Sequence, residues 1–480
     1  MDKFHARTLK KTKIVATLGP ASNTEHTIEQ LIKNGLNVAR LNFSHNTHED
    51  HLKNLTTVRK VAERLNKPVA VFQDLQGPKI RLGNLLEDVI ILEKGTQVTL
   101  FLAKDQQDER IPVQFDMFPY LKEGDRVLIN DGAIRLSADS IDKEEKMAVC
   151  TVRVGGPIKS RKGVNLPDTK LPSIAFTEKD RIDLMFGLEH KVDYVGLSFV
   201  QDAEDIENLR KIISKSEHKP KIVAKIETRE AVRNLKAIIE VSDVVMVARG
   251  DLAVEIDQED VPLIQREMIR LARRYHTPII VATQMLESMV NSPEPTRAEV
   301  NDVATAVLEH ADAVMLSAET ASGNYPVEAV AMMKRIIKRV ERHHKDNLTD
   351  YALSTLEESS DQTTAIAASA SILAHQLKAE LIVVATTSGK TAARVASYRP
   401  TVPIVAITDQ ELTYKQMPMI WGIKAFYLPN VKQNDEGLKS IIDELKERGY
   451  VSEGEKVVYV TGANPHEIGG TNIIKVEKVK

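Results

Sequence analysis

Two short apolar runs, residues 222–226 and 244–248, are followed by charged side chains. Lys225 and Glu227 stand at the end of the first run, and Asp251 follows the second. Both runs consist mainly of Ile, Val and Ala, which is typical of strands buried on both faces of a sheet. Charged side chains at the ends of such strands are expected to lie together in a cleft.

The residue types in this cleft suit phosphate and metal chemistry. Two carboxylates from neighbouring strands, Glu227 and Asp251, are hard oxygen ligands that favour Mg²⁺ or Mn²⁺ over zinc. Lys225 beside them could bind a phosphoryl group. The alternative is a pair of surface salt bridges at the start of two loops, because charged loop residues usually lie in solvent. These residues alone leave both interpretations open.

The elements that would position this cleft repeat along most of the chain, because apolar runs alternate with helical patterns. The first helix is expected around residues 24–34, with Ser22 or Asn23 as its N-cap. Eight strands interleaved with helices predict a (β/α)₈ TIM barrel, whose active site lies at the carboxyl ends of the strands. The predicted strands cover residues 13–18, 38–42, 69–74, 193–199, 222–226, 244–248, 277–282 and 313–316.

Two further regions interrupt or follow the barrel. Residues 78–173 contain short runs separated by glycines and no helical period, which predicts a small all-β lid domain inserted after the third strand. The barrel then comprises residues 1–77 and 174–340, close to the ~250 residues typical of the fold. Residues 341–480 alternate helical patterns with strands and predict a three-layer α/β domain. Its expected strands are residues 381–385, 402–407, 425–428 and 456–461.

The composition limits the classes of partner. The 480 residues include 65 basic and 68 acidic side chains, a net charge of −3, so neither nucleic acid nor a membrane surface is an expected partner. A single cysteine excludes an intrachain disulfide and fits a reducing compartment. Residues 1–13 lack the apolar core of a signal peptide, and no apolar run approaches ~18 residues. We therefore expect a soluble, cytoplasmic protein.

The predicted strand ends share a polar character that a purely structural rim would not need. They supply two acids on neighbouring strands, cations for phosphate, and small hydroxyl groups. In chain order they are Arg40, Asn42, Ser44, Asp74, Ser198, Phe199, Lys225, Glu227, Arg249, Asp251, Thr283, Gln284, Ser317 and Glu319.

The same residues carry a resemblance to the pyruvate kinase family, in the order and approximate spacing of that family. The motifs are KTKIVATLGPAS, NVARLNFSH, VNLP, SFV, KIE, VARGDLAVE, ATQMLESM, PTRAEVNDVA and MLSAETASGNYP. The match covers all three predicted domains. The resemblance implies transfer of a phosphoryl group from phosphoenolpyruvate to ADP, giving pyruvate and ATP with Mg²⁺ or Mn²⁺ as cofactor, and a homotetramer.

Matching positions carry the roles of the family's active-site residues. Glu227 and Asp251 resemble the metal ligands, and Lys225 the residue that stabilises charge on the phosphoryl group and the enolate. Thr283 resembles the threonine beside the enolate carbon that receives a proton, through water. The amides at Gly250 and Asp251 would hold the substrate carboxylate. The full catalytic and substrate-binding set implied is Arg40, Ser198, Lys225, Gly250, Asp251 and Thr283.

The resemblance also implies a nucleotide site, at Arg40, Asn42, His45, Arg81 and Lys162. Arg81 and Lys162 belong to the insert, which by this comparison closes over the metal and excludes water.

The monovalent-cation site of the family is altered in this sequence. Potassium-dependent members bind K⁺ at the positions of Asn42, Ser44, Asp74 and the carbonyl of Leu75. This chain has Lys79 where those members have glutamate, and Leu75 where they have threonine. A fixed ammonium could replace the monovalent cation, so we expect activity without K⁺.

The segment TTSGKT, residues 386–391, predicts an anion site in the C-terminal domain. A nucleotide-binding P-loop would require glycine at position 384, and Val384 excludes it. A strand, a glycine turn and a helix start still offer backbone amides and Lys390 to a phosphate, although an ordinary capped turn has the same pattern. The resemblance favours a phosphorylated effector bound by Thr386, Thr387, Ser388, Gly389, Lys390 and Thr391.

The second effector loop, residues 462–472, differs from that of members activated by fructose 1,6-bisphosphate. It lacks their tryptophan and arginine and carries Glu467. A second phosphate would meet less positive charge there, so a monophosphate such as AMP or ribose 5-phosphate is the expected effector.

Two other functions compete with a kinase, and one further pattern could suggest a zinc site. A metal-dependent lyase acting on a 2-oxo acid would need the carboxylate pair but neither the lid nor Lys162. A catalytically inactive regulator would be expected to have lost Lys225, Glu227, Asp251 or Thr283, and none is missing. A zinc site at His45, His48 and His51 lacks an accompanying cysteine or fixing carboxylate.

Overall fold

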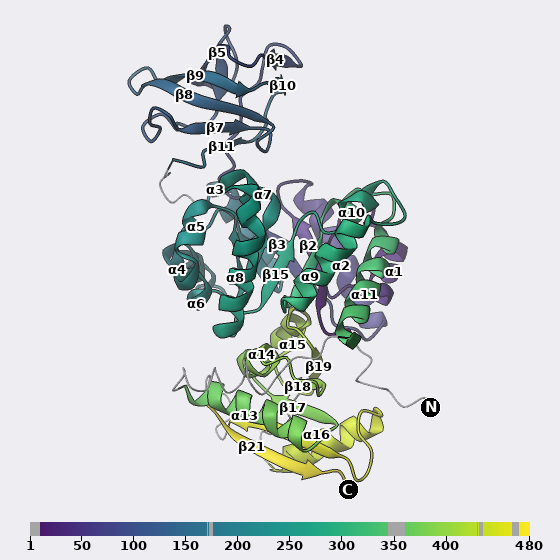
Figure 1. Ribbon diagram of the computed structural model, residues 1–480. Coiled ribbons are helices and arrows are strands. Elements are labelled where there is room, and N and C mark those ends of the chain that lie inside the picture. Colours follow the sequence, from purple (N-terminus) through teal and green to yellow (C-terminus); the bar gives the residue numbers. More distant parts are fainter. Residues whose placement is uncertain are drawn as a thin grey trace.

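The computed structural model describes residues 10–169, 171, 176–343, 361–429, 431, 435–462 and 470–480. Its sheets form three separate bodies (Figure 1). A closed barrel lies in the middle, a smaller all-β region lies beyond one end of it, and a five-stranded sheet with helices lies beyond the other. The predicted fold class is confirmed.

The central body is a closed barrel of eight parallel strands, in which β16 pairs with β1 to complete the circle. Its strands are nearly all buried because helices cover them outside and their own side chains fill the interior. They are β1 (Lys13–Thr17), β2 (Val38–Asn42), β3 (Ala70–Asp74), β12 (Tyr194–Leu197), β13 (Lys221–Ile226), β14 (Val244–Ala248), β15 (Ile279–Ala282) and β16 (Ala313–Leu316). All eight predicted strands are present.

The N-cap of the first barrel helix lies one or two residues after the positions expected from the sequence. Thr24 is the N-cap, since its extended backbone lets the hydroxyl accept from the amide of Thr27 at 3.1 Å. The prediction of Ser22 or Asn23 was wrong: the Ser22 hydroxyl turns back and accepts from the amide of Gly19.

The helices around the barrel are α1 (Glu25–Asn34), α2 (His48–Arg64), α3 (Glu178–Glu189), α4 (Ala203–Ile213), α5 (Arg229–Arg233), α6 (Leu235–Val241), α7 (Arg249–Glu255), α8 (Val261–Arg274), α9 (Arg297–Leu308), α10 (Ala318–Ala321) and α11 (Pro326–His343). Short 3₁₀ turns, Gln258–Asp260 and Glu287–Val290, precede α8 and α9. Within the described residues, no helix is long and apolar enough to cross a membrane.

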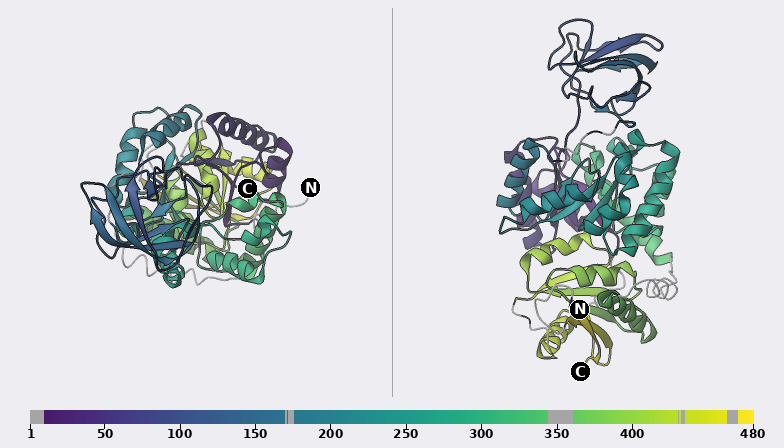
Figure 2. Two further views of the ribbon diagram at one scale, coloured as in Figure 1. Left: turned by 90° about the horizontal axis from the view of Figure 1, so that it is seen from above. Right: turned by 90° about the vertical axis from the view of Figure 1, so that its left-hand side faces the viewer.

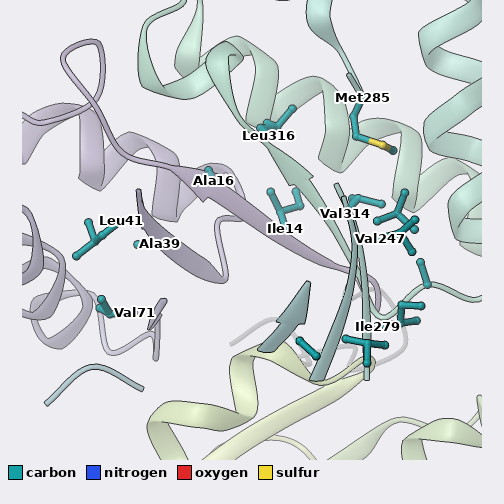
Figure 3. Close-up of a cluster of buried hydrophobic side chains, with 14 of the residues drawn as sticks. Ile14, Ala16, Ala39, Leu41, Val71, Val247, Ile279, Met285, Val314 and Leu316 are labelled. Carbon is teal, nitrogen blue, oxygen red and sulfur yellow. The ribbon is translucent and has the colours of Figure 1, made fainter. Parts of the chain in front are cut away.

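The barrel core has two layers. Between strands and helices, apolar side chains such as Ile14, Leu41 and Val314 pack together (Figure 3). Inside the barrel, Phe72 and twelve other buried residues form a second cluster, to which the C-terminal domain contributes Met419. This methionine is fully buried and closes the amino end of the barrel. The opposite, carboxyl end of the barrel is therefore the end at which an active site is expected.

The all-β body, here called the lid, extends from the carboxyl end of the barrel between β3 and α3 (Figure 2). Its six-stranded sheet has the order β11-β7-β8-β9-β5-β6, and β4 pairs with β10. The strands are β4 (Ile90–Leu92), β5 (Gln97–Leu102), β6 (Ile111–Val113), β7 (Arg126–Ile129), β8 (Ile134–Asp142), β9 (Met147–Val154), β10 (Gly156–Ile158) and β11 (Val164–Asn165).

The C-terminal domain has a sheet of order β19-β18-β17-β20-β21, and only β21 is antiparallel. It docks on the amino end of the barrel, where the Lys13 ammonium donates to the carbonyl of Ile423 at 2.8 Å. Its elements are α13 (Gln362–Gln376), β17 (Leu381–Ala385), α14 (Lys390–Ser397), β18 (Ile404–Thr408), α15 (Glu411–Gln416), a 3₁₀ turn (Met417–Met419), β19 (Ile423–Tyr427), α16 (Asp435–Glu447), β20 (Lys456–Gly462) and β21 (Thr471–Lys478). Sequence reasoning missed β21, whose partly exposed residues give a weak pattern.

Candidate active site

Lys225 lies at the carboxyl end of β13 among oxygens from three neighbouring strands. Its ammonium is 2.7 Å from Glu227 Oε1 and 3.3 Å from Asp74 Oδ1. It also donates to the hydroxyl of Ser198 at 2.7 Å. Burial lowers the pKa of Lys225, but the carboxylates of Asp74, Glu227 and Asp251 more than offset this and raise it above its usual value. The side chain is therefore a permanent cation in the cleft.

Glu227 is almost completely buried and has few hydrogen-bond donors. Its Oε2 accepts from the amide of Phe199 at 2.8 Å. Burial, reinforced by Asp251, raises the pKa of Glu227 to about 7 although Lys225 opposes the shift. A carboxylate with so raised a pKa is one that a bound divalent cation would stabilise in its charged form.

Asp251 faces the same end of the barrel because α7 begins directly after β14, without a connecting loop. Among the residues that the structure describes, no group of three or more His, Cys, Asp or Glu side chains could hold a metal. A cation held by Glu227 and Asp251 would therefore take its other oxygens from water or substrate, as Mg²⁺ commonly does. The donor set fits Mg²⁺ or Mn²⁺.

Thr283 is held in an unusual backbone conformation. Its φ is 72° and that of Gln284 is 54°, a left-handed region that β-branched residues rarely adopt. Its hydroxyl accepts from the amide of Gly250 at 2.8 Å, which places it next to the first turn of α7. Such strain persists only where the surroundings impose it.

Arg249 imposes part of that conformation. Its guanidinium donates to the Thr283 carbonyl at 2.6 Å and forms two hydrogen bonds with the carboxylate of Asp302, at 2.7 and 2.8 Å. The planar guanidinium of Arg249 thus connects α9 to the end of β15 and holds Thr283 in place. Asp302 was not singled out from the sequence, although it lies in the motif PTRAEVNDVA.

Arg40 and Asp74 form a buried pair beside Lys225. Arg40 Nε donates to Asp74 Oδ2 at 2.7 Å, and Nη1 donates to the Thr17 hydroxyl at 2.8 Å. Burial acts to raise the pKa of Asp74, but Lys225 and Arg40 together hold it below its usual value. Asp74 is thus an anion that orients two cations toward the cleft. Neither this bridging position nor Thr17 was predicted from the sequence.

The monovalent-cation positions are only partly assembled. Asn42 Oδ1 accepts from the amide of Ser44 at 3.2 Å, and the Leu75 carbonyl accepts from the Ser198 hydroxyl at 2.8 Å. The ammonium of Lys79 instead lies 3.7 Å from Asp131 in the lid.

A cavity of about 660 Å³ joins the base of the lid to the barrel. It is lined by residues of the lid and of the first turn of α7, among them Lys79, Asp131, Gly250 and Asp251. Lys79 and the candidate metal ligand Asp251 therefore line the same cavity.

The predicted nucleotide residues are divided between barrel and lid. Arg81 and Lys162 lie on adjacent segments at the base of the lid. Arg81 and Gly163 form an isolated antiparallel β-bridge, and the carbonyl of Lys162 accepts a hydrogen bond from the amide of Leu82 at 2.8 Å. His45 is exposed on the barrel rim.

The histidines at 45, 48 and 51 do not gather around a common point. His51 stacks on Phe43 at 4.0 Å, whereas His48 pairs with Asp183 at 2.7 Å.

The predicted effector loop connects the end of β17 to the start of α14, so the expected order of strand, turn and helix is present. Gly389 has a φ of 80°, and its amide donates to the Thr386 hydroxyl at 3.0 Å. The hydroxyls of Thr391 and Thr471 are 2.6 Å apart and link the loop to β21. Glu467 and the rest of residues 463–469 lie outside the described residues.

Comparison with known proteins decides the family. A family model for the barrel domain of pyruvate kinase matches residues 9–330, and one for its alpha/beta domain matches residues 364–477. The chain belongs to the pyruvate kinase family. It is 41% identical to pyruvate kinase 2 of Synechocystis over 98% of this chain and 80% of that protein. Identity to pyruvate kinase of Geobacillus stearothermophilus is 40%, with the same coverage.

A solved structure agrees over the whole chain. A pyruvate kinase from Cryptosporidium parvum superimposes with a TM-score of 0.91 at 33% identity, and the match covers 100% of this chain and 99% of that one. The enzyme is a phosphotransferase that converts phosphoenolpyruvate and ADP into pyruvate and ATP.

Proposed function

We propose that the reaction takes place around Lys225, at the carboxyl end of β13. The bond between the phosphorus and the enol oxygen of phosphoenolpyruvate breaks, and a terminal oxygen of ADP forms the new bond to phosphorus. Negative charge develops on the phosphoryl oxygens and on the departing enolate, and the fixed ammonium of Lys225 stabilises both. The single observation that carries this proposal is the position of that ammonium, within 3.3 Å of Asp74 and closer to Glu227.

The divalent cofactor would be held by Glu227 and Asp251. When bound, Mg²⁺ or Mn²⁺ supplies positive charge that polarises the phosphoryl oxygens. Arg40, oriented by Asp74, would bind the phosphoryl group together with Lys225. In the first turn of α7, the amide of Asp251 and that of Gly250, which also donates to the Thr283 hydroxyl, would bind the substrate carboxylate.

Proton delivery to the enolate would occur at Thr283. Its hydroxyl is fixed by the amide of Gly250 and by the carbonyl of Ala282, to which it donates at 2.6 Å. A water molecule that donates one hydrogen bond to this hydroxyl would give its other proton to the methylene carbon, forming the methyl group of pyruvate, and a proton taken up from solvent would restore the water.

The nucleotide would bind between the barrel rim and the lid, for which we propose the bounds 78–173. Arg40, Asn42 and His45 lie on the rim, and Arg81 and Lys162 at the base of the lid. Closure of the lid would bring the two sets together and exclude water from the transfer.

Activity is proposed to require no K⁺. Lys79 supports this, because it lines the same cavity as the candidate metal ligand Asp251 and carries its own positive charge, which in this structure lies 3.7 Å from Asp131. The test compares rates in potassium chloride and in tetramethylammonium chloride at equal ionic strength. Equal rates are expected, and substantial activation by K⁺ would refute the proposal.

Regulation is proposed to involve a phosphorylated effector on loop 386–391, a monophosphate such as AMP or ribose 5-phosphate in preference to a bisphosphate. Calorimetric titration with each compound tests this, and tighter binding of fructose 1,6-bisphosphate would overturn it. We also propose a cytoplasmic homotetramer, which sedimentation equilibrium would check.

The metal assignment has its own test. Glu227→Gln or Asp251→Asn should raise the Mg²⁺ concentration for half-maximal pyruvate formation by about tenfold or more, since one charged ligand is worth at least ~1.4 kcal/mol. Glu230→Gln on α5 is the matched control. An unchanged Mg²⁺ requirement in both variants would remove the assignment.

A further inference from the structure

A second cavity, of about 380 Å³, lies between the amino end of the barrel and the C-terminal domain. The barrel contributes residues from β12, β13 and the turn after α8, and the C-terminal domain contributes the first turn of α14. Lys221 opens β13, whereas Lys225 and Glu227 stand at the other end of the same strand. The cavity is therefore separate from the active site.

Positive charge dominates the lining of this cavity. Four cations and two acids line it, namely Arg210, Lys221, Lys390, Arg394, Glu240 and Asp243. Two of the cations are paired: Arg210 lies 2.9 Å from Asp243, and Arg394 lies 3.3 Å from Asp361. Among the described residues, the ammonium groups of Lys221 and Lys390 have no hydrogen-bond or ion-pair partner.

Lys221 points from the barrel toward the turn that starts α14. Its ammonium lies 3.5 Å from the position that a Cβ on Gly389 would occupy, so the glycine leaves this space open. Burial lowers the pKa of Lys221, and although Asp243 opposes the shift, the nearby Lys390 adds to it. Two unpaired cations that face one space destabilise each other until an anion joins them.

The remaining walls suit a small organic phosphate. The amino end of α14 favours an oxyanion through its helix dipole, while the amides of Gly389 and Lys390 donate to the hydroxyls of Thr386 and Ser388. Tyr194, Tyr275 and Ile420 supply apolar surface. The volume exceeds that of a phosphate ion and leaves room for an attached organic group.

We propose that this cavity binds a phosphate monoester, with its phosphoryl oxygens between Lys221 of the barrel and Lys390 of the C-terminal domain. The site goes beyond the effector loop, because Lys221 and Tyr275 of the barrel form part of it. A ligand here would join the two domains through one phosphoryl group.

The test follows the reactivity of individual lysines in the full-length enzyme. Acetylation of each lysine is measured by mass spectrometry in inorganic phosphate and in chloride at equal ionic strength. At about twice the dissociation constant two thirds of the sites are occupied, so labelling of Lys221 and Lys390 should both fall about threefold. Labelling of the exposed Lys211 and Lys378 should not change.

Two variants separate this site from the effector loop. In Lys221→Met, phosphate should no longer protect Lys390, whereas Lys221→Arg should retain protection; unchanged unfolding temperatures verify the fold of both. Protection of Lys390 that persists in Lys221→Met would mean that phosphate binds the loop alone, and would overturn the proposal while leaving the proposed effector site intact. Absence of protection at Lys221 in the wild-type enzyme would also overturn it.

Discussion

Replacing Arg249 by leucine should impair proton delivery although Arg249 need not touch the substrate. The substitution removes the hydrogen bonds from the guanidinium to the Thr283 carbonyl and to Asp302. Loss of a hydrogen bond to a charged group costs about 1.5–3 kcal/mol. This is comparable to the ~1–3 kcal/mol of strain at a left-handed residue such as Thr283. The strained conformation would therefore lose the support that holds it.

The expected functional cost is about as large as the stability cost. A displacement of about 1 Å at the reacting centre can reduce the rate ~10²-fold. We expect kcat for pyruvate formation to fall by about that factor with little change in the KM for ADP, because the proposed nucleotide site does not include Thr283.

A second assay isolates the proton step. Exchange of the methyl protons of pyruvate with D₂O, followed by ¹H NMR, should slow at least as much as kcat. Arg249→Lys should recover only part of the activity, because lysine lacks the planar fork. Arg270→Leu, which removes an exposed arginine paired with Glu267, is the control. Normal kcat and normal proton exchange in Arg249→Leu would refute the reasoning.

Three further predictions concern stability. Burial raises the pKa of Glu255 to about 7, so its contribution favours the fold at low pH and is lost as the pH rises through 7. The free energy of unfolding of Glu255→Gln, measured by urea denaturation, should therefore rise relative to wild type between pH 5 and pH 8, by at most about 3 kcal/mol, and a difference that stays constant with pH would contradict this. Gly196→Ala would place a Cβ 2.8 Å from Phe72 and 3.0 Å from Asp74, so urea denaturation should show a loss of about 1–3 kcal/mol; an unchanged midpoint would disprove the close packing. Met419→Ala should cost about 2–5 kcal/mol in the same assay, whereas Met185→Ala, at an exposed position, should cost little, and equal effects would argue against the role of Met419 in closing the barrel.

Strand positions and the polar rim were predictable because both follow from local pattern. A buried parallel strand shows a continuous apolar run, and charged side chains are tolerated where that run ends. That is why Lys225, Glu227 and Asp251 stood out. The cap at Thr24 was missed because three adjacent polar residues qualify, and only the backbone conformation decides among them.

Contacts between distant segments could not be read from the chain. Asp74 on β3 bridges Arg40 on the adjacent β2 and Lys225 on β13, which lies beyond β12, and only the arrangement of these strands in space reveals that the three side chains meet. The fork from Asp302 through Arg249 to Thr283 depends in the same way on the packing of α9. The position of Lys79 depends on the lid, so the sequence identified the substitution but not its partner, Asp131.

Pyruvate formation by Lys225→Met tests the central assignment most directly. ADP-dependent pyruvate formation should fall by at least about 10²–10³-fold, the usual cost of removing one group that stabilises developing charge. The exposed Lys236→Met is the control and should keep the wild-type rate. A correctly folded Lys225→Met enzyme with a near-normal rate would contradict the assignment of charge stabilisation to this lysine.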